Sequence, residues 1–73
     1  MEYQDEEIFL FQFGKRLRKI RIDKGLSQED LANDSDIPIN QIGRIERAEI
    51  NTTLNTIYKI AKALDINITE LFA

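Results

Sequence analysis

The 73-residue sequence predicts an all-α domain built from five short helices. Apolar residues recur at three- and four-residue steps through most of the chain, which places them on single helix faces. Residues that favour helix starts, among them Ser27, Pro38 and Thr53, precede these segments. Apart from an ambiguous apolar run at residues 8–13, no segment alternates in the manner of a half-buried strand.

The first helix is expected from about Asp5 to Lys24, with residues 1–12 forming an N-terminal extension. Its buried face carries four apolar residues at helical spacing: Phe9, Phe13, Leu17 and Ile20. Acidic residues at its start suit the positive end of the helix dipole, and Gly25 is a natural stop. Three further apolar residues are surplus to a single buried stripe: Ile8, Phe11 and Ile22.

The second helix is expected to begin after Ser27, whose hydroxyl can accept a hydrogen bond from the backbone of Asp30. It is short because residues 33–36 make a polar turn, in which Asp36 suits a left-handed backbone. Pro38 opens the third helix, since its fixed φ is tolerated in a first turn. The inner face of this helix is expected to hold Ile37, Ile42 and Ile45.

Thr53 is expected to cap a fourth helix over residues 54–64. Its buried stripe is predicted to comprise Leu54, Ile57, Ile60, Ala61 and Leu64. After a turn, Thr69 is expected to cap a last short helical turn. Connections of a few residues make residues 1–73 one domain, with C-terminal helices over residues 53–73.

The composition argues against several classes of function. The chain has no cysteine and no histidine, which removes thiolate metal sites, the commonest metal ligand and the commonest general base. With no glycine-rich phosphate loop and little mass for a substrate cleft, we expect no enzyme, no cofactor, no metal and no small-molecule substrate. Neither a secretory signal nor a membrane-length apolar run is visible, so we expect a cytoplasmic protein without membrane contact.

The charge is unevenly distributed along the chain. The formal net charge is −3, yet residues 14–24 hold six of the ten basic residues against one acid. Phosphate contact depends on such local patches rather than on the net charge. The alternative interpretation is an amphipathic helix with lysine and arginine on its solvated face.

Residues 27–47 form two helices joined by a short turn, which is the pattern of a DNA-binding helix-turn-helix. The second helix of such a unit must fit a major groove about 12 Å wide. It needs an apolar inner face that holds it and a protruding outer face that reads base edges. Residues 38–46 meet both requirements.

Five stretches of the chain carry a family resemblance: residues 13–21 (FGKRLRKIR), 26–32 (LSQEDLA), 42–47 (IGRIER), 53–64 (TLNTIYKIAKAL) and 69–72 (TELF). In order and spacing they resemble the phage-repressor and Cro type of helix-turn-helix domain, also called the XRE family. The resemblance implies a compact five-helix, lambda-repressor-like DNA-binding domain, in which helices 2 and 3 form the helix-turn-helix.

This resemblance implies roles for the residues at matching positions. Base reading falls to Ile39, Asn40 and Arg44. Arg44 could bond guanine and Asn40 adenine, whereas Ile39 could touch a thymine methyl or, alternatively, pack on the protein. Contacts to the DNA backbone are implied for Gln28, as a phosphate clamp, and for Arg16, Gln41, Gly43, Asn51 and Thr52.

Arg21 and Glu46 match a pair that, in relatives, forms a salt bridge between the first and third helices, so we expect it to be structural. The chain also departs from the family pattern. Asp36 and Ala48 replace glycines that are common in the family turns, and Pro38 replaces the usual capping serine. A left-handed backbone at Ala48 would cost roughly 1 kcal/mol.

A single reading helix covers about half an operator, so we expect a homodimer. Single-domain relatives, such as controller proteins of restriction-modification systems, pair through their C-terminal helices. The interface is therefore expected to include Ile66, Ile68, Leu71, Phe72 and Phe11; the alternative is that these residues close the core of the monomer.

The sequence thus predicts a sequence-specific, double-stranded DNA-binding transcriptional regulator that acts as a dimeric repressor or autoregulator. The alternative is a protein-interaction module, such as the antitoxin of a toxin–antitoxin pair, with a toxin protein as its partner.

Overall fold

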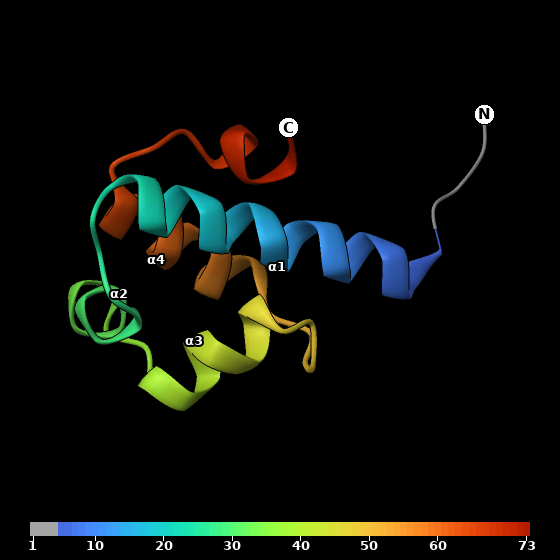
Figure 1. Ribbon diagram of the computed structural model, residues 1–73, viewed down its shortest axis with the longest axis horizontal. Coiled ribbons are helices and arrows are strands. Elements are labelled where there is room, and N and C mark those ends of the chain that lie inside the picture. The colour runs from blue at the N-terminus through green and yellow to red at the C-terminus, as the bar shows by residue number, and fades with distance from the viewer. Residues whose placement is uncertain (1–4) are drawn as a thin grey trace.

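Helix α1 (Glu6–Asp23) runs across the molecule, with α3 packed against one side of it and η1 against another (Figure 1). The computed structural model describes residues 5–73, in the order α1, α2 (Gln28–Ser35), α3 (Ile39–Glu46), α4 (Leu54–Leu64) and η1 (Ile68–Phe72). These residues form no strand, which confirms the all-α class. The fifth element is a 3-10 helix rather than an α-helix, so the count of five α-helices is not confirmed.

The expected N-terminal extension, residues 1–12, is described only from Asp5 onward, because residues 1–4 lie outside the described range. Asp5 caps α1 by accepting a hydrogen bond from the backbone N–H of Glu7 at 2.8 Å. The N-terminal end of α1 extends past the other helices (Figure 1). Among residues 5–73, no helix has the length and apolar character needed to cross a membrane.

The helix starts predicted at Ser27 and Thr53 carry the expected caps. The Ser27 hydroxyl accepts from the backbone N–H of Asp30 at 2.9 Å, and the Asp30 carboxylate accepts from the backbone N–H of Ser27 at 2.9 Å. These bonds hold the pKa of Asp30 below its usual range. Thr53 caps α4 by accepting from the backbone N–H of Thr56 at 3.1 Å.

Left-handed backbone conformations end α2 and α4 and close the turn after α3. Asp36 has φ of 58°, as expected, Asp65 has φ of 55°, and Ala48 has φ of 59°. Asparagine and aspartate tolerate this region, but alanine does not favour it, so Ala48 carries a strain of roughly 1 kcal/mol.

The cap of the last element corrects the sequence expectation, which placed it at Thr69. Asn67 caps η1 instead: its side-chain oxygen accepts from the backbone N–H of Thr69 at 3.0 Å. The Glu70 carboxylate in turn accepts from the backbone N–H of Asn67 at 2.9 Å. The element therefore begins earlier, because Asn67 forms a complete capping box with Glu70.

One core joins all five elements. It consists of Phe13, Leu17, Leu31, Ala32, Ile37, Ile42, Ile45, Ile57, Ile60, Ala61, Leu64 and Leu71. Of the residues expected in buried stripes, Ile20 is partly buried and packs against this core, whereas Phe9 is 43% exposed and Leu54 is 80% exposed. Phe9 and Leu54 stand in the first turns of their helices, before the point where those helices meet the core.

The closest approach of α1 and α3 requires Gly14. A Cβ added there would lie 2.5 Å from the carbonyl oxygen of Glu46 and 2.7 Å from that of Ile45. Both neighbours are backbone atoms of α3 and cannot swing away. The missing side chain therefore lets α3 lie directly on α1.

We predict that Gly14→Ala lowers the free energy of unfolding by about 1–3 kcal/mol, because the methyl group must force the two helices apart. Urea denaturation followed by circular dichroism measures the change. Arg18→Ala, at an exposed position on the same helix, is the matched control and should change stability little. A Gly14→Ala protein as stable as the parent would contradict the close packing.

Candidate nucleic-acid interface

The outer face of α3 and the residue that follows its last turn carry a row of three polar side chains: Asn40, Arg44 and, at the C-cap, Arg47. They are four and three residues apart, so they lie in line along the helix. All three residues are exposed, whereas Ile42 and Ile45 on the inner face are 0% and 2% exposed. The helix is thus held by an apolar side and presents hydrogen-bonding groups to solvent.

Two further predicted residues flank this row. Gln41 is half-buried beside it. Ile39 is 48% exposed and lines a shallow hollow shared with Glu29 and Asn33 of α2. Ile39 therefore lies toward α2, at the edge of the outer face, and its half-exposed side chain leaves both alternative roles open.

The three residues between α2 and α3 fix the angle between the two helices. Asp36 turns the chain with its left-handed backbone, and its backbone N–H donates to the carbonyl of Ala32. Ile37 is 6% exposed and anchors the turn in the core. This arrangement of α2, a short turn and α3 is a helix-turn-helix.

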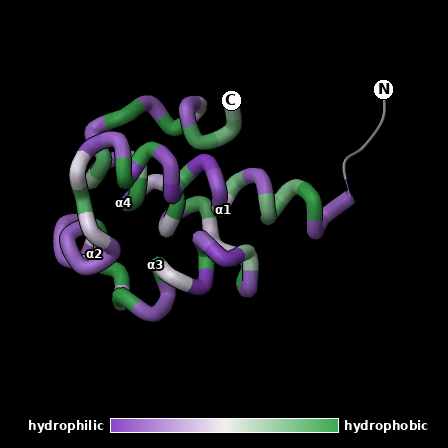
Figure 2. Tube along the Cα trace, in the orientation of Figure 1, coloured by the Kyte–Doolittle hydropathy of each residue, from purple (hydrophilic) through white to green (hydrophobic). Residues whose placement is uncertain are grey.

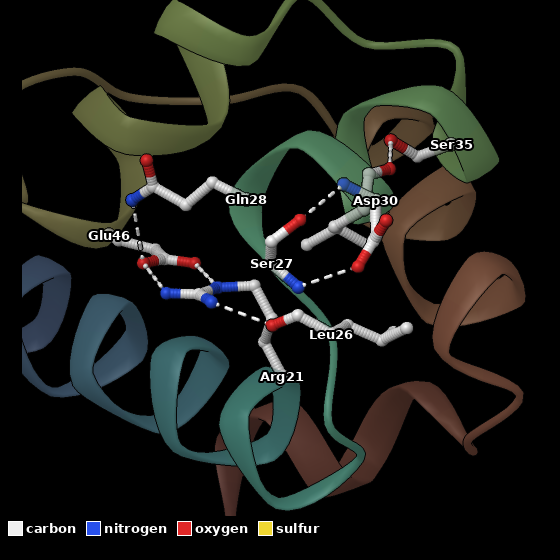
Figure 3. A network of polar contacts seen from close by, with 8 residues as sticks. Arg21, Leu26, Ser27, Gln28, Asp30, Ser35 and Glu46 are labelled. Atoms are coloured by element: carbon white, nitrogen blue, oxygen red, sulfur yellow. Dashed lines mark hydrogen bonds and ion pairs between the residues drawn. The ribbon is translucent and has the colours of Figure 1, made fainter.

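A buried ion pair ties α3 to α1. Arg21 donates from Nε to Glu46 Oε2 at 2.6 Å and from Nη2 to Glu46 Oε1 at 3.0 Å (Figure 3). Arg21 Nη1 also donates to the carbonyl oxygen of Leu26 at 2.8 Å. The hydrogen bonds that Arg21 donates to Glu46 raise the pKa of Arg21 despite its burial. This is where the structure places the salt bridge expected between the first and third helices.

Gln28 joins the same network from the first turn of α2. Its Nε2 donates to Glu46 Oε1 at 3.1 Å, and its side chain points toward α3 (Figure 3). Gly43 lies beneath it: a Cβ there would be 3.5 Å from Gln28 Oε1 and 2.9 Å from Arg47 Nη1. Gly43 is buried, and an added Cβ would be in ordinary contact with Gln28 and would crowd only the flexible end of Arg47.

Arg16, which the resemblance implies as a contact to the DNA backbone, lies on a side of α1 other than the one that meets α3. Its Nε donates to the carbonyl oxygen of Glu70, in η1, at 2.9 Å. Gly14 and Arg21 meet α3. At about 100° per residue, both lie roughly 140–160° around α1 from Arg16, so Arg16 points to a different side of the helix. The sequence could not reveal this direction, since it depends on where η1 packs.

The connection between α3 and α4 holds the last two predicted backbone contacts. Asn51 is exposed, and its side-chain amide lies 3.4 Å from a carboxylate oxygen of Glu6. The Thr52 hydroxyl oxygen is buried and has no hydrogen-bond partner among residues 5–73. Only Asn51 is therefore open to a ligand at this position.

Sequence reasoning missed two residues of this face, Arg47 and Glu49. Arg47 Nε donates to Glu49 Oε2 at 2.8 Å, and Arg44 Nε lies 3.9 Å from Glu49 Oε1. The bond from Arg47 lowers the pKa of Glu49 and raises that of Arg47. The spacing from Asn40 to Arg44 to Arg47 is a helical repeat and could have identified Arg47.

The predicted dimer residues do not all reach the surface. Ile68 and Phe72 are 38% and 49% exposed, whereas Leu71 is 1% exposed and belongs to the core. Ile66 is partly buried and packs against the core as well. Leu71 is thus unavailable to a second chain, because it closes the core of the monomer.

Among residues 5–73, the ring of Phe11 has no contact with the ring of Phe72, although Phe11 lines an open hollow together with the C-terminal Ala73. The ring of Phe72 instead stacks on Phe9, with centroids 6.1 Å apart, and contacts Phe13 at 5.3 Å. Phe9 and Phe11 are two residues apart and therefore point to nearly opposite sides of α1. The aromatic surface next to η1 includes Phe9, not Phe11.

A family model described as helix-turn-helix, HTH_3, matches residues 17–71 of the chain. The chain belongs to this family. Its curated relatives include the control protein C.BamHI of Bacillus amyloliquefaciens, 42% identical over 60 residues that span 81% of this chain and 74% of that protein. They also include the control protein C.SmaI of Serratia marcescens, 40% identical over 57 residues, or 78% of this chain and 68% of that protein.

Solved structures agree with this HTH_3 assignment. The restriction-modification controller protein C.AhdI of Aeromonas hydrophila has a TM-score of 0.85 and 49% identity, covering 86% of this chain and 96% of that one. The controller protein C.Esp1396I has a TM-score of 0.81 and 34% identity, covering 88% and 82%. The relatives are thus control proteins and helix-turn-helix regulators, and the comparisons do not favour the antitoxin alternative.

We predict that Glu46→Gln lowers the free energy of unfolding by about 3 kcal/mol, since it leaves the buried guanidinium of Arg21 without its counter-charge. Thermal and urea unfolding measure the loss. The matched control is Glu49→Gln, which removes an exposed carboxylate from an arginine pair and should change stability little. Equal losses of unfolding free energy in the two variants would show that the buried Arg21–Glu46 pair stabilises the fold no more than the exposed Arg47–Glu49 pair.

Proposed function

We propose that this chain is a sequence-specific, double-stranded DNA-binding transcriptional regulator that places α3 in the major groove. The observation that carries the proposal is the row of Asn40, Arg44 and Arg47 on a helix fixed from behind. An α-helix is about 10–12 Å across and the major groove about 12 Å wide, so the row would face base edges. The family membership and the names of the relatives support the same function.

Each side chain of the face takes a role suited to its chemistry. Arg44 would donate two hydrogen bonds to guanine O6 and N7, and Asn40 would pair with adenine N6 and N7. Ile39, at the edge of the face, would touch a thymine methyl group. Arg47, which lies farther along the row, would contact a phosphate rather than a base.

Gln28 would bind a phosphate at the start of α2. Its amide nitrogen carries two N–H groups, and only one is used in the bond to Glu46. The bond to Glu46 holds the amide in place, so the second N–H would be presented to the DNA without loss of rotamer freedom on binding. Gln41 and Asn51 would contact the backbone on either side.

We further propose that the protein acts as a homodimeric repressor or autoregulator. A single α3 covers one half-site, and dimers of helix-turn-helix proteins read two half-sites about 34 Å apart. The exposed side chains of Ile68 and Phe72, together with Phe9, form an apolar surface beside η1 that would pair with a second copy.

Arg44→Ala should weaken binding to a selected duplex by about 1–3 kcal/mol and relax the preference at one base position. Fluorescence anisotropy with the selected duplex and with random duplexes, repeated across salt concentrations, measures both effects. Gln28→Ala should weaken binding to all duplexes alike, because a phosphate contact carries no sequence information.

Arg18→Ala is the matched control, because it removes the same charge from an exposed position on α1 away from α3. It should leave the affinity for the selected duplex unchanged. If Arg44→Ala retains both affinity and base preference, α3 does not read DNA through this face.

Ile68→Lys should shift the protein from dimer to monomer, since it places a charge in the proposed apolar interface. Sedimentation equilibrium of the parent and the variant at micromolar concentrations measures the mass. Lys59→Ala, at an exposed site on α4, is the control and should leave the mass unchanged. A parent protein that remains monomeric at high micromolar concentration would refute the homodimer.

A further inference from the structure

A second surface of the protein lies along α1 and has no role in the function proposed above. Five residues follow one another at steps of three, four, three and four: Ile8, Phe11, Lys15, Arg18 and Ile22. This is the spacing of the residues that form the contact line of a two-helix coiled coil. We call these five residues the α1 seam.

All five residues of the seam are exposed, although three of them are apolar. Ile8, Phe11 and Ile22 are 52%, 55% and 48% exposed. The seam lines an open hollow of about 910 Å³ along α1. Along the tube of α1, hydrophobic and hydrophilic residues alternate up to the projecting N-terminal turns (Figure 2).

The middle of the seam is cationic, and its two cations, Lys15 and Arg18, are not paired with a carboxylate within residues 5–73. The Lys15 ammonium lies over the ring of Phe11, 5.2 Å from its centroid, and so stays within the seam. Lys19 beside them is paired with Asp23 at 2.8 Å. The seam therefore has apolar ends and two positive charges at its centre.

The seam does not share a surface with the reading face of α3. One side of α1 contacts α3 through Gly14 and Arg21. Another side contacts η1 through Phe9 and Arg16. The seam lies between these two sides, opposite the fully buried Leu17. A duplex bound by α3 would leave the seam accessible.

A second copy of the chain does not fit the seam. An antiparallel pair would bring the central Lys15 and Arg18 of both copies together. A parallel pair would set each cation against its own counterpart. Like charges along such a contact line disfavour association, whereas opposite charges select the partner.

We propose that the α1 seam docks an amphipathic helix of another protein, one with apolar residues at both ends of its contact line and two acidic residues in the middle. The acids meet Lys15 and Arg18, and the apolar residues pack on Ile8, Phe11 and Ile22. The seam runs over 15 residues, which are 14 helical rises or about 21 Å, so the partner segment is a helix of about four turns.

An anionic membrane surface is a poorer occupant of the same residues. Helices that lie on membranes have a broad apolar face bordered by cations. Here the opposite side of α1 is committed to the core, and the exposed acids Glu7 and Asp23 border the seam. These carboxylates would face lipid phosphates, whereas a single partner helix can pass between them.

The test titrates the full chain into two fluorescein-labelled helical peptides of about 18 residues, with anisotropy as the readout. Both peptides carry leucine at the outer contact positions; one carries glutamate and the other lysine at the two central positions. We expect the glutamate peptide to bind at least about tenfold more tightly, and the difference to shrink as salt is raised.

Variants of the chain then assign the binding to the seam. The double variant Lys15→Glu, Arg18→Glu should reverse the preference, so that the lysine peptide binds more tightly. Phe11→Ala should weaken binding of the glutamate peptide, while the matched control Lys59→Glu on α4 should preserve it. Circular dichroism confirms that each variant is folded, and binding to a selected duplex should be unchanged in all seam variants.

Three results would overturn the proposal. The first is equal binding of the two peptides, or a preference that the double variant does not reverse. The second is binding to vesicles of phosphatidylcholine with about one quarter phosphatidylglycerol, lost in the seam variants, without binding to the glutamate peptide. The third is a dimer mass that falls to that of a monomer on Phe11→Ala, which would make the seam an interface between copies of the chain.

Discussion

The buried pair of Arg21 and Glu46 is the interaction on which the rest of the structure depends. Helix α3 has eight residues and no side-chain hydrogen bond at its N-terminus, so it is too short to be stable alone. Its position is set by its contacts, and the ion pair joins its last turn to α1 and, through Leu26 and Gln28, to the start of α2. Removing two charges from water is costly, and the bidentate geometry with the added carbonyl bond offsets that cost. The pair thus contributes orientation more than net stability.

Two glycines lie where other residues come close to the helices: Gly14 on α1 and Gly43 on α3. Gly14 removes a side chain from α1 where the α3 carbonyls approach, and Gly43 removes one from α3 where Gln28 and Arg47 cross it. The hydrogen bonds of Glu46 with Arg21 and Gln28 hold the end of α3 against α1 and α2. A helix that reads base edges must be held to within a fraction of an ångström, and here covalent geometry and packing provide that constraint before any DNA is bound.

Helix caps and helix faces could be predicted from the sequence. The direction and burial of side chains that contact distant segments could not. The caps at Ser27 and Thr53 and the left-handed Asp36 depend on neighbouring residues, so the chain carries their signal directly. Periodicity also places Asn40 and Arg44 on one face of α3. The direction of Arg16 and the burial of Leu71 depend instead on where η1 packs, which no local pattern records. Phe9 and Leu54 fit a helical repeat but lie in first turns that do not reach the core. Residue spacing identifies the face of a helix, but it does not show whether another segment covers that face.

The three sides of α1 explain how an acidic chain can carry two binding surfaces. One side holds α3 through Gly14 and Arg21, and another holds η1 through Phe9 and Arg16, so neither is available to a partner. The basic residues that remain free of these contacts, Lys15 and Arg18, gather on the third side, while Arg44 and Arg47 gather on α3. Because these two cationic surfaces share no side chain, DNA and a partner helix would not compete for the same residues.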